Sequence, residues 1–284
     1  MSGGQARCIT VAALQASYGS DMDANIEKTA GLIRDAAAQG AQVILPSELF
    51  QGLYFCTTQD ERWFDFAFPA ASHPCVVALQ PLARELKVVI PVSIFERDGP
   101  HTYNSVVLLD HEGCVMGLYR KSHIPDGPGY QEKFYFRPGD TGFRVWDTLY
   151  GRIGVGICWD QWFPECARAM MLKGAEILFY PTAIGSEPHD PNLQTMYAWR
   201  RAMQGHAVSN VVPVVAANRI GTEQANSLPQ TFYGRSFIAD HRGELLQSFE
   251  GDQEGVLVQQ FDLDFLRKHR SAWGFFRDRR PEFY

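Results

Sequence analysis

The stretch that decides the fold is Arg152-Ile-Gly-Val-Gly-Ile-Cys158-Trp-Asp-Gln-Trp-Phe-Pro-Glu165. The residues from 152 to 157 predict a buried β-strand, because apolar side chains and glycines follow one another without a charge after Arg152. Pro164 then stands near the first turn of a helix predicted over Pro164–Leu172, where a missing N–H costs nothing. In α/β proteins, sites tend to collect at such strand ends, and Cys158 lies at this one.

The same alternation of strand and helix continues on both sides of this stretch. Further strands are predicted over Cys8–Gln15, Val43–Leu45, Val88–Phe95, Ile177–Tyr180 and Val212–Ala217, and helices over Asp23–Gln39, Val76–Leu86 and around Asn192–Ser209. Two hairpins are predicted, one joining 103–110 to 114–119 and the other joining 232–239 to 244–249. Alternating strands and helices with hairpins among them predict an α/β layered domain with mixed rather than purely parallel sheets.

Composition narrows the class of protein. The chain has 284 residues, of which 45% are hydrophobic and 20% charged, and this argues against disorder and against a coiled coil. A net charge of −6 makes a nucleic-acid partner improbable, since phosphate backbones are bound by basic surfaces. No apolar run approaches the roughly 20 residues that a membrane span requires, so we expect no membrane partner and a cytoplasmic location. With no linker or repeat, residues 1–284 are predicted to form one domain.

The six cysteines do not predict a disulfide framework or a metal site. None forms a Cys-x-x-Cys pair, and no cluster of cysteine and histidine has the short spacing of a structural zinc site. Most are therefore expected to be small buried hydrophobic residues, with one possible nucleophile to be found by its context. The six are Cys8, Cys56, Cys75, Cys114, Cys158 and Cys166.

Three reactive residues follow apolar strands and make chemical sense together. Glu48 follows Val43-Ile-Leu-Pro-Ser, Lys121 follows Cys114-Val-Met-Gly-Leu-Tyr-Arg, and Cys158 ends the stretch quoted first. A thiol needs a general base such as Glu48, and the oxyanion it creates needs Lys121 and a backbone N–H, that of Trp159. Each has a simpler reading as a surface acid, a solvated basic loop or a packed core thiol. The spacings alone do not show that the three meet.

The strings around these residues resemble the three signatures of the nitrilase (carbon–nitrogen hydrolase) superfamily, in the expected order. They are Leu45-Pro-Ser-Glu48-Leu, Tyr119-Arg-Lys121-Ser-His-Ile-Pro and Gly156-Ile-Cys158-Trp-Asp-Gln-Trp-Phe-Pro-Glu165. The resemblance covers the whole chain. A narrower likeness, to members that hydrolyse an N-carbamoyl amine, rests on the stretches 126–136, 185–190 and 217–223, the last being Ala217-Asn-Arg-Ile-Gly-Thr-Glu223.

The resemblance implies a role for each of these residues. Glu48 is expected as general base, Lys121 as acid and oxyanion stabiliser, Cys158 as nucleophile and Glu132 as a second acid that supports Lys121. It also implies a four-layer α-β-β-α sandwich, assembly into a homo-oligomer of two or more subunits, and catalysis without a metal or organic cofactor.

A cationic N-carbamoyl amine would need an anion at the far end of its pocket. Glu187, between a strand and a long helix, is the candidate anion that binds the free ammonium of the substrate. Its simpler interpretation is an exposed loop acid near a helix N-terminus, which the helix dipole also favours. Tyr54, Tyr130 and Trp159 are the candidates that line the aliphatic spacer. The tail, about 271–284, mixes arginine with aromatic residues and is expected at a subunit contact rather than on nucleic acid.

Other functions remain open on the sequence alone. A β-ureidopropionase or an aliphatic amidase of the same superfamily would share the catalytic residues, but would need a basic or a neutral pocket in place of Glu187. A catalytically silent nitrilase-like partner protein would have a broken triad, whereas all three residues are present here. A papain-like Cys–His hydrolase is disfavoured because no histidine stands in a recognisable context.

Overall fold

The first β-layer of the molecule is built largely from the N-terminal half of the chain. The computed structural model describes residues 6–190 and 192–284, so residues 1–5 of the predicted domain lie outside it. The strands of this layer are β1 (Cys8–Gln15), β2 (Val43–Leu45), β3 (Ile90–Asp98), β4 (His101–Leu109), β5 (Val115–Arg120) and β14 (Gly255–Asp262). They form two sheets, β14-β1-β2 and β3-β4-β5. The sheets adjoin because Val43 forms a parallel bridge with Val89, whose carbonyl accepts the Ile44 N–H.

The second β-layer is one six-stranded sheet with a parallel centre. It contains β6 (Val145–Asp147), β7 (Arg152–Val155), β8 (Ile177–Pro181), β9 (Val214–Ala217), β12 (Phe237–Ala239) and β13 (Leu245–Ser248). The order is β13-β12-β9-β8-β7-β6, in which β7, β8 and β9 are parallel and the remaining pairs are antiparallel. This is the mixed sheet that the sequence predicts. A separate ribbon pairs β10 (Ile220–Glu223) with β11 (Gln230–Tyr233).

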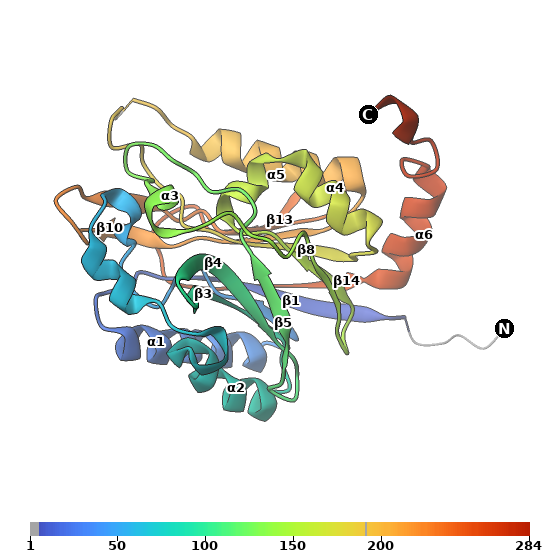
Figure 1. Cartoon of the computed structure of the whole chain (residues 1–284). Coiled ribbons are helices and arrows are strands. Elements are labelled where there is room, and N and C mark those ends of the chain that lie inside the picture. The colour runs from blue at the N-terminus through green and yellow to red at the C-terminus, as the bar shows by residue number, and fades with distance from the viewer. Residues whose placement is uncertain (1–5, 191) are drawn as a thin grey trace.

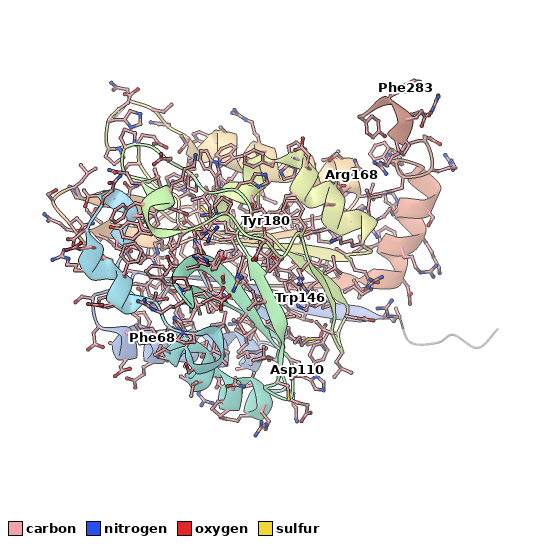
Figure 2. The ribbon with its side chains drawn as sticks, viewed as in Figure 1. Phe68, Asp110, Trp146, Arg168, Tyr180 and Phe283 are labelled. Carbon is pink, nitrogen blue, oxygen red and sulfur yellow. The ribbon has the colours of Figure 1, made fainter. Side chains whose placement is uncertain are left out.

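Helices cover the outer faces of the two β-layers (Figure 1). The helices α1 (Met22–Ala38) and α2 (Pro74–Leu86) pack on the first layer, and α4 (Pro164–Leu172) and α5 (Met196–Asn210) pack on the second. Between the layers lies a buried cluster to which Val11, Phe179 and Trp146 belong, whereas Tyr180 packs in the cluster beneath α4 and α5 (Figure 2). The predicted α-β-β-α sandwich is confirmed.

The ends of the sandwich differ in what they carry. In Figure 1 the short helix α3 (Glu132–Tyr135) lies at one end, and α6 (Leu263–Trp273) with the C-terminal segment lies at the other. Phe283 of that segment is 72% exposed and projects away from the layers (Figure 2). Helical turns of 3₁₀ type complete the structure at Phe55–Thr57, Glu61–Phe66, Ala70–Ser72, Cys158–Trp162 and Pro281–Phe283.

Local sequence explains the helix boundaries. The Asp21 side chain accepts the Ala24 N–H at 3.1 Å and so begins α1, while the His73 ring accepts the Cys75 N–H at the start of α2. Proline stands in the first turn of both α2 and α4, where its missing N–H is not needed. The predicted helix over Pro164–Leu172 is therefore confirmed with the same bounds.

One predicted strand is wrong. The run 232–239 is not continuous, because Gly234 and Arg235 both adopt positive φ angles, 63° and 61°. The chain leaves the ribbon of β10 and β11 at this point and enters the second sheet as β12. Helix α5 begins at Met196 rather than near Asn192. Neither β14 nor α6 was predicted.

Candidate active site

Glu48, Lys121 and Cys158 each lie beyond the carboxyl end of a strand. Glu48 follows β2, Lys121 follows β5 directly, and Cys158 begins the turn after β7. The Lys121 Nζ donates to Glu48 Oε1 at 2.8 Å and to Glu132 Oε2 at 2.7 Å. All three charged side chains are buried, none more than 1% exposed. The fold thus brings together an ammonium and two carboxylates that lie 73 and 11 residues from it in the chain.

Burial and charge pairing act in opposite directions on these groups. Burial by itself lowers the pKa of Lys121, but the charges of Glu132 and Glu48 outweigh it and hold this pKa well above its usual value. Burial raises the pKa of Glu132, and the Lys121 charge works against that rise. Lys121 therefore keeps its positive charge at neutral pH. A fixed cation in a site shielded from water is what a developing oxyanion requires.

The two carboxylate oxygens of Glu48 are used unequally. Oε1 accepts hydrogen bonds from Lys121 and from the Nδ2 of Asn104 at 2.7 Å. Oε2 is buried and has no hydrogen-bond partner among the described residues. A buried oxygen without a donor is costly if its only role is structural, but it is free to take up a proton. Asn104 was missed from the sequence because nothing local marks an asparagine whose partner is 56 residues away.

Cys158 stands on a strained turn. Its φ of 39° lies in the left-handed region that residues other than glycine seldom adopt. Such strain persists only where the surroundings hold it, and it is found at reacting residues. The Sγ atom lies 3.9 Å from the Ala183 carbonyl and 4.0 Å from the Gln161 Nε2. Burial raises the pKa of this thiol well above its usual value, Glu48 adds to the rise and Lys121 opposes it. The thiol is therefore protonated at rest and needs a base.

Asp160 joins the Cys158 turn to the segment after β5. Its carboxylate is fully buried and accepts the Ile157 N–H at 2.9 Å and the Tyr119 hydroxyl at 2.7 Å. It also accepts the main-chain N–H of His123 at 3.1 Å and lies 2.7 Å from the His123 Nδ1. The Asp160 side chain thus holds both the turn that carries Cys158 and the segment that carries Lys121. Its position beside the cysteine was visible in the sequence, but its partners were not.

One cavity of about 200 Å³ opens onto the thiol. Its wall includes Cys158, Glu132, Trp159, Tyr130 and Glu187, so candidates for the reacting end and the substrate end share one space. The Trp159 N–H donates to no main-chain carbonyl of residues 6–190 and 192–284. It is therefore free to serve an oxyanion.

The far part of the cavity is formed by the loop after β8. Glu187 is half-buried there, and burial raises its pKa while His189 lowers it. The Tyr130 hydroxyl accepts the Gly185 N–H at 3.0 Å and the Gln230 amide at 2.8 Å. These bonds fix the Tyr130 ring against the loop that carries Glu187.

Tyr54 does not line the cavity, contrary to the prediction. Its side chain is fully buried, and its hydroxyl donates to Glu132 Oε1 at 2.7 Å. Its main-chain N–H donates to Glu223 Oε2 at 2.6 Å, which holds the residue behind the cavity wall. The ring meets Tyr130 edge-on, with the centroids 5.9 Å apart. Sequence missed this placement because Glu223 lies 169 residues away.

Two absences are observed in the part of the chain that the structure describes. No group of three or more His, Cys, Asp or Glu side chains there is arranged to hold a metal ion. In the same ranges, none of the helices has the length and the apolar character needed to cross a membrane.

Comparison with known proteins gives a consistent result. The family described as carbon-nitrogen hydrolase matches residues 10–271. An N-carbamoylputrescine amidase of Solanum tuberosum is 58% identical over 283 residues, covering 98% of this chain and 94% of that protein. A citrullinase of Francisella tularensis subsp. tularensis is 50% identical, covering 97% and 96%. The crystal structure of a carbon-nitrogen hydrolase from Helicobacter pylori G27 superposes with a TM-score of 0.92 at 38% identity, covering 98% and 97%.

Proposed function

The chain belongs to the carbon–nitrogen hydrolase (nitrilase) family, and from this membership we propose that it hydrolyses N-carbamoylputrescine to putrescine, carbon dioxide and ammonia. The observation that carries the proposal is that one cavity contains both the Cys158 thiol and the Glu187 carboxylate. A nucleophile at one end and an anion at the other suit a carbamoyl group joined to an ammonium by an aliphatic spacer. Such a reaction is one step towards polyamines from arginine through agmatine.

In the first half of the reaction, Glu48 Oε2 takes the proton of the Cys158 thiol as the sulfur attacks the carbamoyl carbon. The carbonyl oxygen becomes an oxyanion, which the Lys121 ammonium and the Trp159 N–H stabilise. The tetrahedral intermediate collapses when the carbon–nitrogen bond breaks. The departing nitrogen takes the proton held by Glu48, which leaves an acyl group on Cys158.

In the second half, water replaces the departed nitrogen. Glu48 accepts a proton from the water as its oxygen attacks the carbon of the thiocarbamate, which still carries the second nitrogen, and the same two donors hold the second oxyanion. Collapse breaks the carbon–sulfur bond, returns the proton from Glu48 to Cys158 and releases a carbamic acid. The carbamic acid then loses carbon dioxide, which breaks the second carbon–nitrogen bond and frees the remaining nitrogen product. Glu132 keeps the Lys121 ammonium in place through both halves, since its Oε2 accepts one of the ammonium hydrogens.

We further propose one catalytic domain over 1–284 that acts as a homo-oligomer in the cytoplasm, with its tail, about 271–284, at a subunit contact and with no metal or organic cofactor. Support for the contact comes from the exposure of large aromatic side chains, since buried aromatic and arginine anchors dominate interfaces. Trp273, Phe283 and Tyr284 are 59%, 72% and 76% exposed.

The test is a substrate comparison. Release of ammonia and of the amine product is measured with N-carbamoylputrescine, citrulline, N-carbamoyl-β-alanine and a simple aliphatic amide, with Cys158→Ala as the blank. We expect cysteine-dependent release of putrescine at a kcat/KM well above that for the other three compounds.

Two results would contradict the proposal in different ways. Preferred turnover of citrulline, the acidic carbamoyl compound or the neutral amide would leave the catalytic residues standing but overturn the substrate. Absence of turnover with all four would favour a catalytically silent partner protein, although the three reactive residues are intact.

A further inference from the structure

The stretch Ala217-Asn-Arg-Ile-Gly-Thr-Glu223 has no part in the mechanism above, yet it contains a fully buried arginine at the end of β9. The Nη1 of Arg219 donates to both oxygens of Glu223 at 2.8 Å. Its Nη2 donates to the main-chain carbonyls of Glu48 at 3.1 Å, Leu49 at 2.7 Å and Gly52 at 3.2 Å. One guanidinium therefore binds three carbonyls of the loop that begins with the candidate general base.

The chemistry of the guanidinium suits this task. It presents several N–H donors in a rigid plane, so it can bind a carboxylate on one edge and a set of carbonyls on another, which an ammonium cannot do. The rings of Tyr18 and Phe232 lie 5.1 Å and 5.4 Å from its central carbon. Glu223 supplies the counter-charge that a buried cation of this kind needs.

The bound loop is strained and needs support. Leu49, directly after Glu48, has a φ of 49° although it is not glycine. A residue holds this conformation only where its surroundings determine it. The Leu49 carbonyl accepts the shortest of the three Nη2 bonds, and the Leu49 N–H donates to Ser93 Oγ at 2.9 Å. Hydrogen bonds to the Leu49 carbonyl and from the Leu49 N–H thus fix the backbone that orients the Glu48 side chain.

The same ion pair also reaches Glu132. Glu223 Oε2 accepts the Tyr54 N–H at 2.6 Å, and the Tyr54 hydroxyl donates to Glu132 Oε1 at 2.7 Å. Glu48 and Glu132 are the two carboxylates that bind the Lys121 ammonium. Both are therefore connected to a single buried pair that itself touches neither the ammonium nor the cavity.

We propose that Arg219, together with Glu223, is the positioning residue that fixes the general base Glu48 against Lys121. This inference rests on the role proposed for Glu48, but it does not depend on the identity of the substrate. Arg219 contacts no reacting atom, and its contribution is to hold the carboxylate in the one place from which it can take the thiol proton.

The test compares Arg219→Lys with a matched control, Arg200→Lys. Arg200 is also a buried arginine, on α5, whose Nη2 binds two main-chain carbonyls while its Nη1 pairs with Glu250, but it lies outside the cavity wall. In Arg219→Lys we expect kcat for N-carbamoylputrescine to fall about 10–100-fold with KM changed less than about threefold, since misplacement of a reacting group by about 1 Å costs rate rather than binding. Arg200→Lys is expected to retain the kcat and KM of the unaltered enzyme.

A second readout needs no carbamoyl substrate. Alkylation of Cys158 by iodoacetamide, which reaches the thiol through the cavity, is followed against pH by mass spectrometry of the peptide that contains it, because the exposed Cys8 and Cys114 would react as well. In Arg219→Lys we expect slower alkylation at every pH, since a displaced Glu48 carboxylate no longer reaches the thiol proton. Arg200→Lys should follow the profile of the unaltered enzyme.

The outcomes separate this inference from the proposed function. If the unaltered enzyme hydrolyses none of the carbamoyl compounds but Arg219→Lys alters Cys158 alkylation as described, the substrate is wrong and the positioning role stands. A folded Arg219→Lys with unchanged kcat and an unchanged alkylation profile would overturn the inference, as would equal damage in Arg200→Lys. If Arg219→Lys fails to fold, Glu223→Gln decides, because it keeps the arginine and its carbonyl bonds and is expected to lose about 3–10-fold in kcat with the same slowing of Cys158 alkylation. An unchanged profile in folded Glu223→Gln would then overturn it.

Discussion

The two ends of the cavity are built in different ways. At the reacting end, Glu48 and Glu132 are buried, and each accepts a hydrogen bond from the buried Lys121 ammonium, at 2.8 Å and 2.7 Å. At the other end, Glu187 is half-buried on a loop in the cavity wall, where burial and the charge of His189 act on its carboxylate. The first set of charges is paired within the protein, whereas the second carboxylate is left for a ligand.

This difference assigns chemistry and selectivity to separate structures. Charges that are paired during folding are already oriented when the substrate arrives, so they contribute to the transition state without reorganisation. A half-exposed carboxylate contributes binding that is weaker, screened by salt and specific for a cation. Changes at the reacting end should therefore lower kcat by orders of magnitude, and changes at the other end should mainly alter KM.

The largest effect is expected for Cys158→Ala. Removing the nucleophile removes the covalent route, so turnover should fall at least about 10⁴-fold. Because Glu187 is untouched, calorimetric titration should show that N-carbamoylputrescine still binds with an affinity within a few-fold of the unaltered enzyme. Residual turnover above about 1% in a folded, pure variant would remove Cys158 from its assigned role.

Lys121→Ala should have the next largest effect, because it lowers both kcat and the free energy of unfolding. Loss of one oxyanion donor lowers kcat about 10²–10³-fold. The two carboxylates are then buried beside each other without a counter-charge, and breaking a buried pair in this way costs about 3–5 kcal/mol of unfolding free energy.

The pH dependence of that lost stability identifies its cause. Carboxyl groups whose pKa is raised in the folded state bind more protons there than in the unfolded chain, so stability rises as the pH falls towards their unfolded values. The melting temperature of Lys121→Ala should therefore increase between pH 7.5 and 5.5, and the unaltered enzyme should increase less. If the variant is equally destabilised at both pH values, repulsion between Glu48 and Glu132 is not the reason.

Sequence predicts much of the reacting end because its three main residues stand in ordered strings after apolar strands. The four layers follow from the same alternation, together with the hairpins and the family resemblance. What sequence does not reveal are the groups that hold these residues. Asn104, Asp160 and Arg219 meet their partners across 56, 41 and 171 residues, and no local pattern marks such a pair.

The errors have the same origin. Tyr54 was assigned to the cavity on the strength of its aromatic ring, but Glu223 and Glu132 hold it in the wall behind. The run 232–239 has the composition of a strand, yet Arg235 in a left-handed conformation divides it between two sheets. In both cases contacts with another part of the chain override a local preference, since the two halves of 232–239 pair with different strands, β10 and β9.

Glu187→Gln tests the other end of the cavity. We expect KM for N-carbamoylputrescine to rise about tenfold, equivalent to about 1.4 kcal/mol, with kcat nearly unchanged, because the variant loses a charge but keeps its shape. KM for a neutral aliphatic amide should not change. Asp190→Asn is the matched control, since it removes a carboxylate from the same loop that does not line the cavity. Equal losses for the cationic and the neutral substrate would remove Glu187 from its role.

The smallest expected effect is a dependence of KM on pH that arises from protonation of the Glu187 carboxylate. Burial raises the pKa of this carboxyl, so a growing fraction is protonated as the pH falls from 7.5 to 5.5, and a neutral carboxyl no longer attracts an ammonium. KM for N-carbamoylputrescine should increase a few-fold over this range, while KM for a neutral amide stays constant. His189 and Asp126 also carry ionisable side chains in the cavity wall. Glu187→Gln separates them: its KM should be high throughout and nearly flat with pH. A slope as steep as that of the unaltered enzyme would assign the effect to His189 and Asp126, and the cation would then be recognised by the cavity as a whole rather than by one half-buried carboxylate.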